Sequence, residues 1–165
     1  MEKIKLFDPF TNESEKNAIK QILDSHFWAS GEGVGKVQKF EEKFSKYTSS
    51  KSCVAVNSGT AALNLALSMY NIKNKEVIIP SLSFVSTANA VIENGGIPKF
   101  VDIDKNTLCM DPEKILKAIS KKTKVVLPVH FGGLTSNLGE ISKLCKENKI
   151  SLVEDAAHAA GSLHQ

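Results

Sequence analysis

Short apolar runs alternate with segments of helical periodicity through most of this chain. The apolar runs lie at residues 53–56, 76–79, 98–103, 124–129 and 150–153. The helical segments between them lie at about residues 60–70, 84–94, 112–120 and 137–148. This alternation predicts βαβ units with right-handed crossovers in a mostly parallel sheet. Because the runs are continuously apolar, we expect helices on both faces of that sheet.

The first fifty residues follow a different pattern, which predicts an amino-terminal helical segment over residues 1–50 ahead of an α/β domain over residues 51–165. A first helix is expected over about residues 13–25, where Asn12 and Glu15 form a capping pair. A second helix follows the loop at residues 26–35. The three glycines of that loop do not predict a dinucleotide turn, because no strand precedes them.

Composition narrows the range of functions. The chain has 165 residues, is 42% hydrophobic and carries a net charge of +3 from 21 lysines and 18 acids. The lysines are scattered, which argues against a nucleic-acid surface. Arginine is absent from the sequence, so an anion would be held by backbone amides, hydroxyls or lysine. No apolar signal segment or membrane span is present, which predicts a soluble, cytoplasmic protein with no membrane partner.

The three cysteines are far apart along the chain, and we expect them to be reduced thiols rather than ligands of zinc or parts of a disulfide framework. The histidines also lack a spacing typical of metal ligands. The sequence therefore predicts no metal site.

Polar and aromatic residues follow the apolar runs and, in a parallel sheet, would meet at its carboxyl edge, where open α/β sheets bind ligands. These residues are Ser58, Gly59, Thr60, Ser83, Phe84, Asp102, Asp104, His130, Asp155 and His158. Gly59 and Thr60 open a helix and are suited either to an anion or to simple capping. Phe84 would either cover a flat ring or lie in the core. Asp155 is interpreted as a functional acid or as a helix cap or ion-pair member, and the two histidines as polar site residues or core residues.

Together these residues suit pyridoxal phosphate. The helix start would hold the phosphate, the aromatic ring would cover the pyridine, and a carboxylate would keep the ring nitrogen protonated. That protonated ring can accept electrons during amino-group transfer.

Four motifs also resemble the DegT/DnrJ/EryC1/StrS family of aminotransferases. They read NSGTAAL at residues 57–63, IPSLSFVSTANAV at 79–91, PVHFGG at 128–133 and EDAAHAAG at 154–161. Any one motif is moderately specific, whereas four in this order are a strong signal. The resemblance extends from about Phe7 to the last residue.

The resemblance implies a partial large domain of the aspartate aminotransferase fold (fold type I of pyridoxal-phosphate enzymes) in a homodimer. It implies an amino group moved from glutamate to a nucleotide-linked keto sugar, in amino-sugar or surface-polysaccharide synthesis. By position, Ser58, Gly59 and Thr60 would bind the phosphate, and Phe84 would stack on the pyridine. Asp155 would pair with the ring nitrogen and His158 with the ring hydroxyl. The substrate would lie near Trp28, Ser30 and Gly31 in an active-site loop, and near His130.

The sequence departs from the family at one important position. The family's Schiff-base lysine belongs to a motif downstream of the EDAAH stretch, and none of the 21 lysines here matches it. The family's carboxyl-terminal small domain is also expected to be absent, and this chain alone to be inactive. In a fold with strand order 3-2-4-5-6-7-1, the run at residues 53–56 would lack its neighbours, and an unpaired strand invites rearrangement.

Three interpretations remain open from the sequence. The leading one is a fragment of a sugar aminotransferase. Relatives with histidine in place of the lysine are sugar dehydratases, and the missing position leaves that alternative open. The third is a remnant without catalysis that acts as a binding partner.

Overall fold

A computed structural model of the chain describes residues 8–28 and 35–163 and divides it into two compact units, Met1–Ala55 and Val56–Gln165. In the first unit, α1 covers Glu13–Asp24 and α2 covers Lys36–Tyr47, as the periodicity predicts. The predicted capping box is present, because the Asn12 side chain accepts from the helix and the Glu15 side chain accepts from the Asn12 N–H. Neither of these two helices has a buried residue.

Residues 53–56 form no strand, and the sequence prediction of one is wrong. A parallel strand needs a neighbouring strand that exchanges backbone hydrogen bonds with it along its length. The structure instead gives the backbone N–H of Ala55 a side-chain partner, the Glu41 carboxylate, at 2.8 Å. Val54 and Val56, which a sheet would bury, are exposed.

The second unit alternates strands and helices as predicted, with shorter elements than the apolar runs. The strands are β1 (Glu76–Pro80), β2 (Ile97–Val101), β3 (Thr123–Val126) and β4 (Ser151–Leu152). The helices are α3 (Gly59–Ser68), α4 (Val85–Glu93), α5 (Pro112–Ala118), the short 3₁₀ helix η1 (Phe131–Gly133) and α6 (Leu138–Glu147). Asp111 caps α5 through a hydrogen bond to the Glu113 N–H, with Pro112 at the first helical position as expected.

The four strands form one parallel sheet in the order β2-β1-β3-β4. This order matches the 3-2-4-5 part of the resembled fold, so the predicted parallel α/β architecture is confirmed. The strand β1 lies between two neighbours and is buried along most of its length. The edge strand β2 contains Pro98, a residue that sheets tolerate at an edge because it cannot donate a hydrogen bond.

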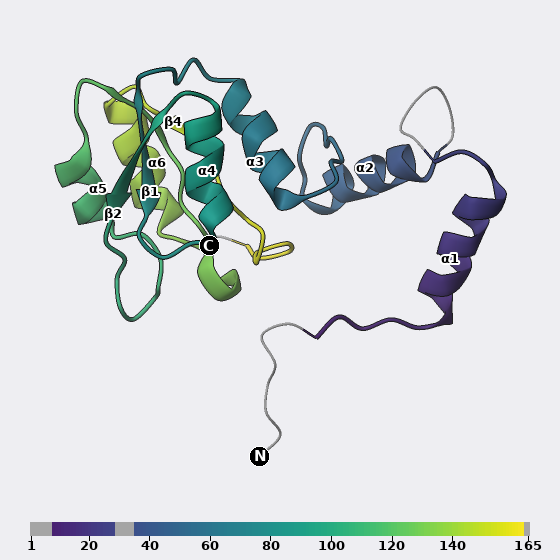
Figure 1. Cartoon of the computed structure of the whole chain (residues 1–165). Coiled ribbons are helices and arrows are strands. Elements are labelled where there is room, and N and C mark those ends of the chain that lie inside the picture. The colour runs from purple at the N-terminus through teal and green to yellow at the C-terminus, as the bar shows by residue number, and fades with distance from the viewer. Residues whose placement is uncertain (1–7, 29–34, 164–165) are drawn as a thin grey trace. The chain divides into compact units, whose positions relative to one another are not determined.

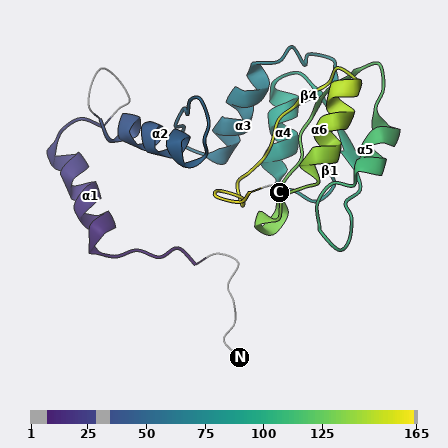
Figure 2. The same cartoon turned by 180° about the vertical axis from the view of Figure 1, so that it is seen from behind.

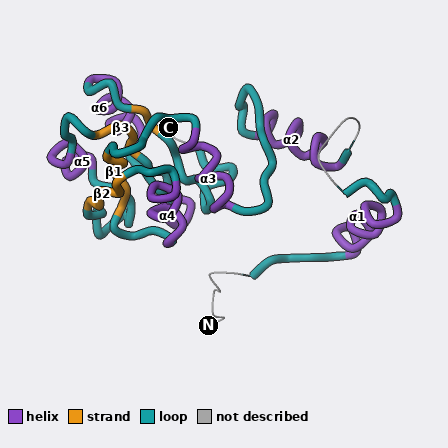
Figure 3. The backbone as a smooth tube through the Cα atoms, turned by 45° about the horizontal axis from the view of Figure 1, so that its top comes forward, coloured by secondary structure: helices purple, strands orange, loops and turns teal. Residues whose placement is uncertain are grey.

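Helices cover both faces of the sheet, which explains its continuously apolar strands (Figure 3). One core cluster joins α3 and α4 to the sheet, and its members include Leu67, Val77 and Val91. The other cluster lies on the α5 and α6 side and includes Ile78 and Ile141. Figure 2 brings α6 to the front, as seen from behind the view of Figure 1. Alternate residues of β1 thus point into different cores, as the pleat of a strand requires.

The helices α3 and α4 begin at the same edge of the sheet. The helix α4 follows β1 and so begins at its carboxyl end. The helix α3 ends before the connection that enters β1 at Glu76, so its own start lies toward the carboxyl edge. In Figure 1 both helices begin on the lower side of the second unit, where η1 and the yellow segment after β4 also lie. None of the helices in the described ranges has the length and apolar character that crossing a membrane requires.

Candidate functional site

Backbone hydrogen bonds beyond β3 and β4 bring His130 and Asp155 together. The Asp155 N–H donates to the Pro128 carbonyl at 2.9 Å, and the His130 N–H donates to the Asp155 carbonyl at 3.1 Å. Val129 and Asp155 form an isolated parallel bridge. The sheet pairing therefore continues past the named strands and fixes the backbone of Asp155 at the carboxyl edge.

The start of α3 carries the predicted anion-binding residues. The Ser58 side chain accepts from the Ala61 N–H at 3.2 Å, so Ser58 acts as the amino-terminal cap. Its carbonyl accepts from the Ala62 N–H. Within the described part of the chain, the amides of Gly59 and Thr60 have no hydrogen-bond partner. A β-carbon added at Gly59 would meet no atom within 4 Å, so this end of the helix is open to a ligand.

The Asp155 side chain is half-buried and held from two directions. Its Oδ2 accepts from the Thr87 hydroxyl at 3.1 Å, and its Oδ1 accepts from the Ala157 N–H at 3.3 Å. Thr87 lies in the first turn of α4 and is fully buried. The acid therefore lies on the side of the sheet that α4 and α3 cover.

Phe84 is not a core residue. It immediately precedes α4 and is 74% exposed, so the alternative that placed its ring in the core is wrong. The residue lines a cavity of about 170 Å³, together with Ser83 and Thr87. A largely exposed aromatic ring at this edge is available to cover a flat ligand.

His158 is exposed and oriented by the turn after β3. Its Nδ1 accepts from the Gly132 N–H at 3.2 Å, and its ring meets the Phe131 ring edge-on, with centroids 5.7 Å apart. An Nδ1 that accepts leaves the proton of the neutral ring on Nε2. His158 can thus donate a hydrogen bond from Nε2 to a ligand oxygen.

His130 was expected near the substrate, but it lies in the interior. It is 2% exposed, and both of its ring nitrogens have protein partners. Nδ1 accepts from the buried Ser136 N–H at 3.1 Å, which leaves Nε2 to donate to the Glu154 carboxylate at 3.0 Å. With both nitrogens engaged, His130 links three segments of the chain and has no nitrogen left for a substrate.

Asp102 and Asp104 do not join the other residues of the edge. Asp102 is exposed and pairs with Lys114 at 3.7 Å. Asp104 accepts from the Asn106 and Thr107 amides, and these bonds lower its pKa, the Thr107 bond most. The structure therefore assigns both acids to the loop between β2 and α5.

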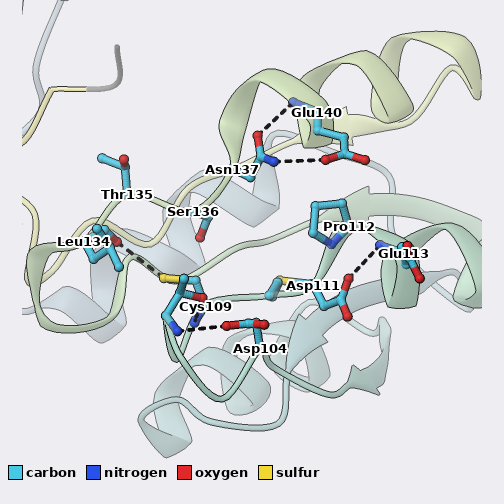
Figure 4. Close-up of a pocket in the computed structure, with 12 residues that line it drawn as sticks. Asp104, Cys109, Asp111, Pro112, Glu113, Leu134, Thr135, Ser136, Asn137 and Glu140 are labelled. Carbon is cyan, nitrogen blue, oxygen red and sulfur yellow. Dashed lines mark hydrogen bonds between the residues drawn. The ribbon is translucent and has the colours of Figure 1, made fainter.

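Asp104 also lines a cavity of about 650 Å³ on the α5 and α6 side (Figure 4). Several polar groups of that cavity serve as helix caps. Asp111 caps α5, and the Asn137 side chain accepts from the Glu140 N–H at the start of α6. Asp111 and Asn137 therefore serve the local structure of the two helix starts.

The predicted substrate loop is described only in part. Ser30 and Gly31 lie outside the described residues. Trp28 is 68% exposed, and its indole N–H donates to the Ile22 carbonyl at the end of α1, at 3.1 Å. Within the first unit, the ring therefore lies beside the end of α1.

The described residues contain no group of three or more side chains that could hold a metal ion. Cys53, Cys109 and Cys145 are free thiols. Burial raises the pKa of the Cys145 thiol to about 11, so this residue is a core thiol rather than a nucleophile.

Sequence reasoning missed two features of this edge. The first is Thr87, which lies in the first turn of α4 and whose contact with Asp155 spans 68 residues. The second is Gly133, whose φ of +87° favours glycine and where a β-carbon would lie 3.0 Å from the His158 carbonyl oxygen. The HFGG motif carried a signal for the second, because paired glycines mark a special turn.

Comparisons with known proteins match almost the whole described chain to one family. The model of the DegT/DnrJ/EryC1/StrS aminotransferase family matches residues 9–165. The spore coat polysaccharide biosynthesis protein SpsC of Bacillus subtilis is 42% identical over 152 residues, which are 92% of this chain and 38% of SpsC.

Two solved structures are also similar. The 3-amino-5-hydroxybenzoic acid synthase has a TM-score of 0.87 at 33% identity, over 93% of this chain and 40% of that chain. The Escherichia coli GDP-4-keto-6-deoxy-D-mannose-3-dehydratase with bound hydrated pyridoxal phosphate has a TM-score of 0.82 at 33% identity. The match covers 90% of this chain and 39% of the dehydratase chain.

The chain thus spans about 40% of the length of the proteins it matches. An open helix start, an exposed aromatic ring, an anchored carboxylate and a histidine donor fit pyridoxal phosphate, which is the cofactor that the comparisons support. On this combined sequence and structural match, the chain belongs to the DegT/DnrJ/EryC1/StrS aminotransferase family.

Proposed function

We propose that this chain forms the cofactor-binding part of a pyridoxal-phosphate enzyme that transfers an amino group, with glutamate as donor, to a nucleotide-linked keto sugar. The product would serve amino-sugar or surface-polysaccharide synthesis. The 42% identity to SpsC, a spore coat polysaccharide biosynthesis protein, supports this class of substrate.

The phosphate is assigned to the start of α3. The amides of Gly59 and Thr60 and the Thr60 hydroxyl would donate to it, aided by the helix dipole. Ser58 supports this arrangement indirectly, because its side chain caps the next amide, that of Ala61. Because the chain has no arginine, a dianion would be held by backbone amides, hydroxyls or lysine.

The ring of the cofactor is assigned to three side chains. Phe84 would cover one face of the pyridine, His158 would donate from Nε2 to the ring hydroxyl, and the Asp155 carboxylate would hold a proton on the ring nitrogen. When bound, the cofactor supplies an electron sink for the bonds around the reacting nitrogen. The role of Asp155 is to keep that nitrogen cationic through the charge of its carboxylate.

The observation that carries the proposal is the position of the Asp155 carboxylate. It is anchored by backbone pairing at the carboxyl edge, and Thr87 holds its side chain on the side that α3 and α4 share. A cofactor whose phosphate lies on α3 would present its ring on this side.

The remaining assignments follow from the resemblance. We propose that residues 1–50 provide a helical segment with an active-site loop near the substrate, to which Trp28, Ser30 and Gly31 belong, and that residues 51–165 form the incomplete α/β part. The active enzyme would be a cytoplasmic homodimer. No lysine is among the residues assigned to the cofactor, so this chain would bind it without a covalent bond and would be inactive alone.

A dehydratase of the same family is a second candidate. It is supported by the structural likeness to the E. coli GDP-4-keto-6-deoxy-D-mannose-3-dehydratase, at a TM-score of 0.82. Incubation of the active enzyme with glutamate and a nucleotide keto sugar separates the two, because an aminotransferase yields an amino sugar and a dehydratase a deoxygenated one. A binding partner without catalysis would yield neither.

The test is binding of pyridoxamine phosphate, measured by calorimetry. This form of the cofactor has no aldehyde, so it cannot react with the 21 lysines. Asp155→Ala should raise the Kd by about 10- to 100-fold, the value of a lost charge-assisted hydrogen bond, while phosphate-anchored binding persists.

Asp102→Ala is the matched control, because it removes an exposed acid that lies at the end of another strand. It should leave the Kd unchanged. Equal affinity of the wild type and Asp155→Ala, or equal losses in both variants, would contradict the assignment. In the active enzyme, Asp155→Ala should abolish turnover.

A further inference from the structure

Two hydroxyl groups form a chain that ends on the Asp155 carboxylate. Ser83, just before α4, has its Oγ 2.6 Å from the Thr87 Oγ1, and the Thr87 Oγ1 is 3.1 Å from the Asp155 Oδ2. Thr87 has no exposed surface, and Ser83 is half-buried. The contacts join the first turn of α4 to the segment after β4.

The direction of these hydrogen bonds follows from their donors. A carboxylate only accepts, so the single proton of the Thr87 hydroxyl points to Asp155. Ser83 must then donate to Thr87. The other carboxylate oxygen accepts from the Ala157 N–H, so bonds on both oxygens fix the plane of the Asp155 carboxylate.

The Thr87 hydroxyl does not need Asp155 to satisfy its own bonding. A threonine in a helix commonly donates to the carbonyl three or four residues earlier. Thr87 instead directs its proton out of the helix to a residue 68 positions away. The Ser83 donor polarises the Thr87 hydroxyl further and strengthens this second bond.

We propose that Thr87 is a positioning residue for the cofactor ring, which aims the Asp155 carboxylate at the pyridine nitrogen, and that Ser83 aligns the Thr87 hydroxyl. This inference rests on the proposed function and extends it to two residues that would not touch the cofactor. It implies that Thr87 affects binding only through the ring nitrogen.

The test compares two ligands that differ at one atom, pyridoxamine phosphate and its 1-deaza analogue, in which a C–H replaces the ring nitrogen. Thr87→Val removes the hydroxyl and keeps the shape of the side chain. It should weaken binding of pyridoxamine phosphate about tenfold and change binding of the 1-deaza analogue by less than about twofold.

Two further variants define the origin of the effect. Thr87→Ser restores the hydroxyl and should recover most of the affinity for pyridoxamine phosphate. Ser86→Ala, the matched control, removes a neighbouring buried hydroxyl of α4 and should affect neither ligand. Equal weakening of both ligands by Thr87→Val, or no weakening of either, would overturn the proposal.

A second measurement needs no ligand and separates this inference from the proposed function. In a double-mutant cycle of Thr87→Val and Asp155→Ala, followed by urea unfolding of the full chain, the two residues should be coupled by about tenfold in the folding equilibrium. Additive effects would overturn the hydrogen-bonded positioning. Coupling in a protein that binds pyridoxamine phosphate and its 1-deaza analogue equally well would instead refute the assigned role of Asp155, and with it the positioning role.

Discussion

Replacement of His130 should destabilise the second unit strongly, because the ring satisfies a buried donor. In His130→Ala, the buried Ser136 N–H loses its acceptor, which costs about 1–3 kcal/mol. The bond from Nε2 to Glu154 contributes less, about 0.5–1.5 kcal/mol, because that carboxylate is 44% exposed. The sum predicts a loss of about 3 kcal/mol in the free energy of unfolding, more than a hundredfold in the folding equilibrium.

Two conservative variants separate the two hydrogen bonds of the ring. Asparagine places its carbonyl oxygen near the position of Nδ1 and can still accept from Ser136. Glutamine places its amide nitrogen near the position of Nε2 and can still donate to Glu154. Because the bond to Ser136 is the more buried of the two, we expect the order of stability wild type, His130→Asn, His130→Gln, His130→Ala.

Urea unfolding followed by far-UV circular dichroism measures this order. The fluorescence of Trp28 is unsuitable, because the only tryptophan of the chain lies in the first unit. The reasoning fails if His130→Ala costs less than about 1 kcal/mol, or if His130→Gln is as stable as His130→Asn.

The remaining predictions concern acid stability and the turn before the Asp155 segment. A hydrogen bond from Ser120 lowers the pKa of Glu76 below 4.5 in spite of the opposing effect of burial, so its stabilisation should be complete above that value and disappear as the pH falls through the lowered pKa. Acid unfolding of Glu76→Gln tests this, and an unchanged stability difference down to pH 2 would contradict it. Gly133→Ala should lower the free energy of unfolding by roughly 1–2 kcal/mol because of the positive φ, with a further loss from the close contact of the new β-carbon with the His158 carbonyl. Gly132→Ala is its control, because φ is also positive at Gly132 but an added β-carbon would meet no atom within 4 Å. Equal losses of stability in the two variants, measured by denaturant unfolding, would exclude a role for the His158 contact.

Local signals allowed the elements of this fold to be predicted from sequence. The caps at Asn12 and Asp111 involve residues two or three positions apart, so the sequence contains all that determines them. The parallel sheet followed from the regular alternation of apolar runs and helical segments, whereas its strand order followed only from the family resemblance. The strand at residues 53–56 could not be judged in this way, because strand formation depends on a neighbour and not on the run itself.

The candidate site was predictable as a set of edge residues but not as an arrangement. The sequence places Asp104 and Asp155 equally at strand ends, and only the packing of loops separates them. The burial of His130 and the contact between Thr87 and Asp155 depend on segments that lie far apart in the sequence. Such contacts have no periodicity from which they could be inferred.

The state of the cofactor nitrogen tests the central claim most directly. Pyridoxamine phosphate labelled with ¹⁵N in the ring, bound to this chain, should show the chemical shift of a protonated nitrogen near neutral pH. The same ligand bound to Asp155→Ala should lose that shift. An unprotonated nitrogen in the wild-type complex, or a protonated one that persists without the carboxylate, would contradict the assignment of Asp155 to the ring.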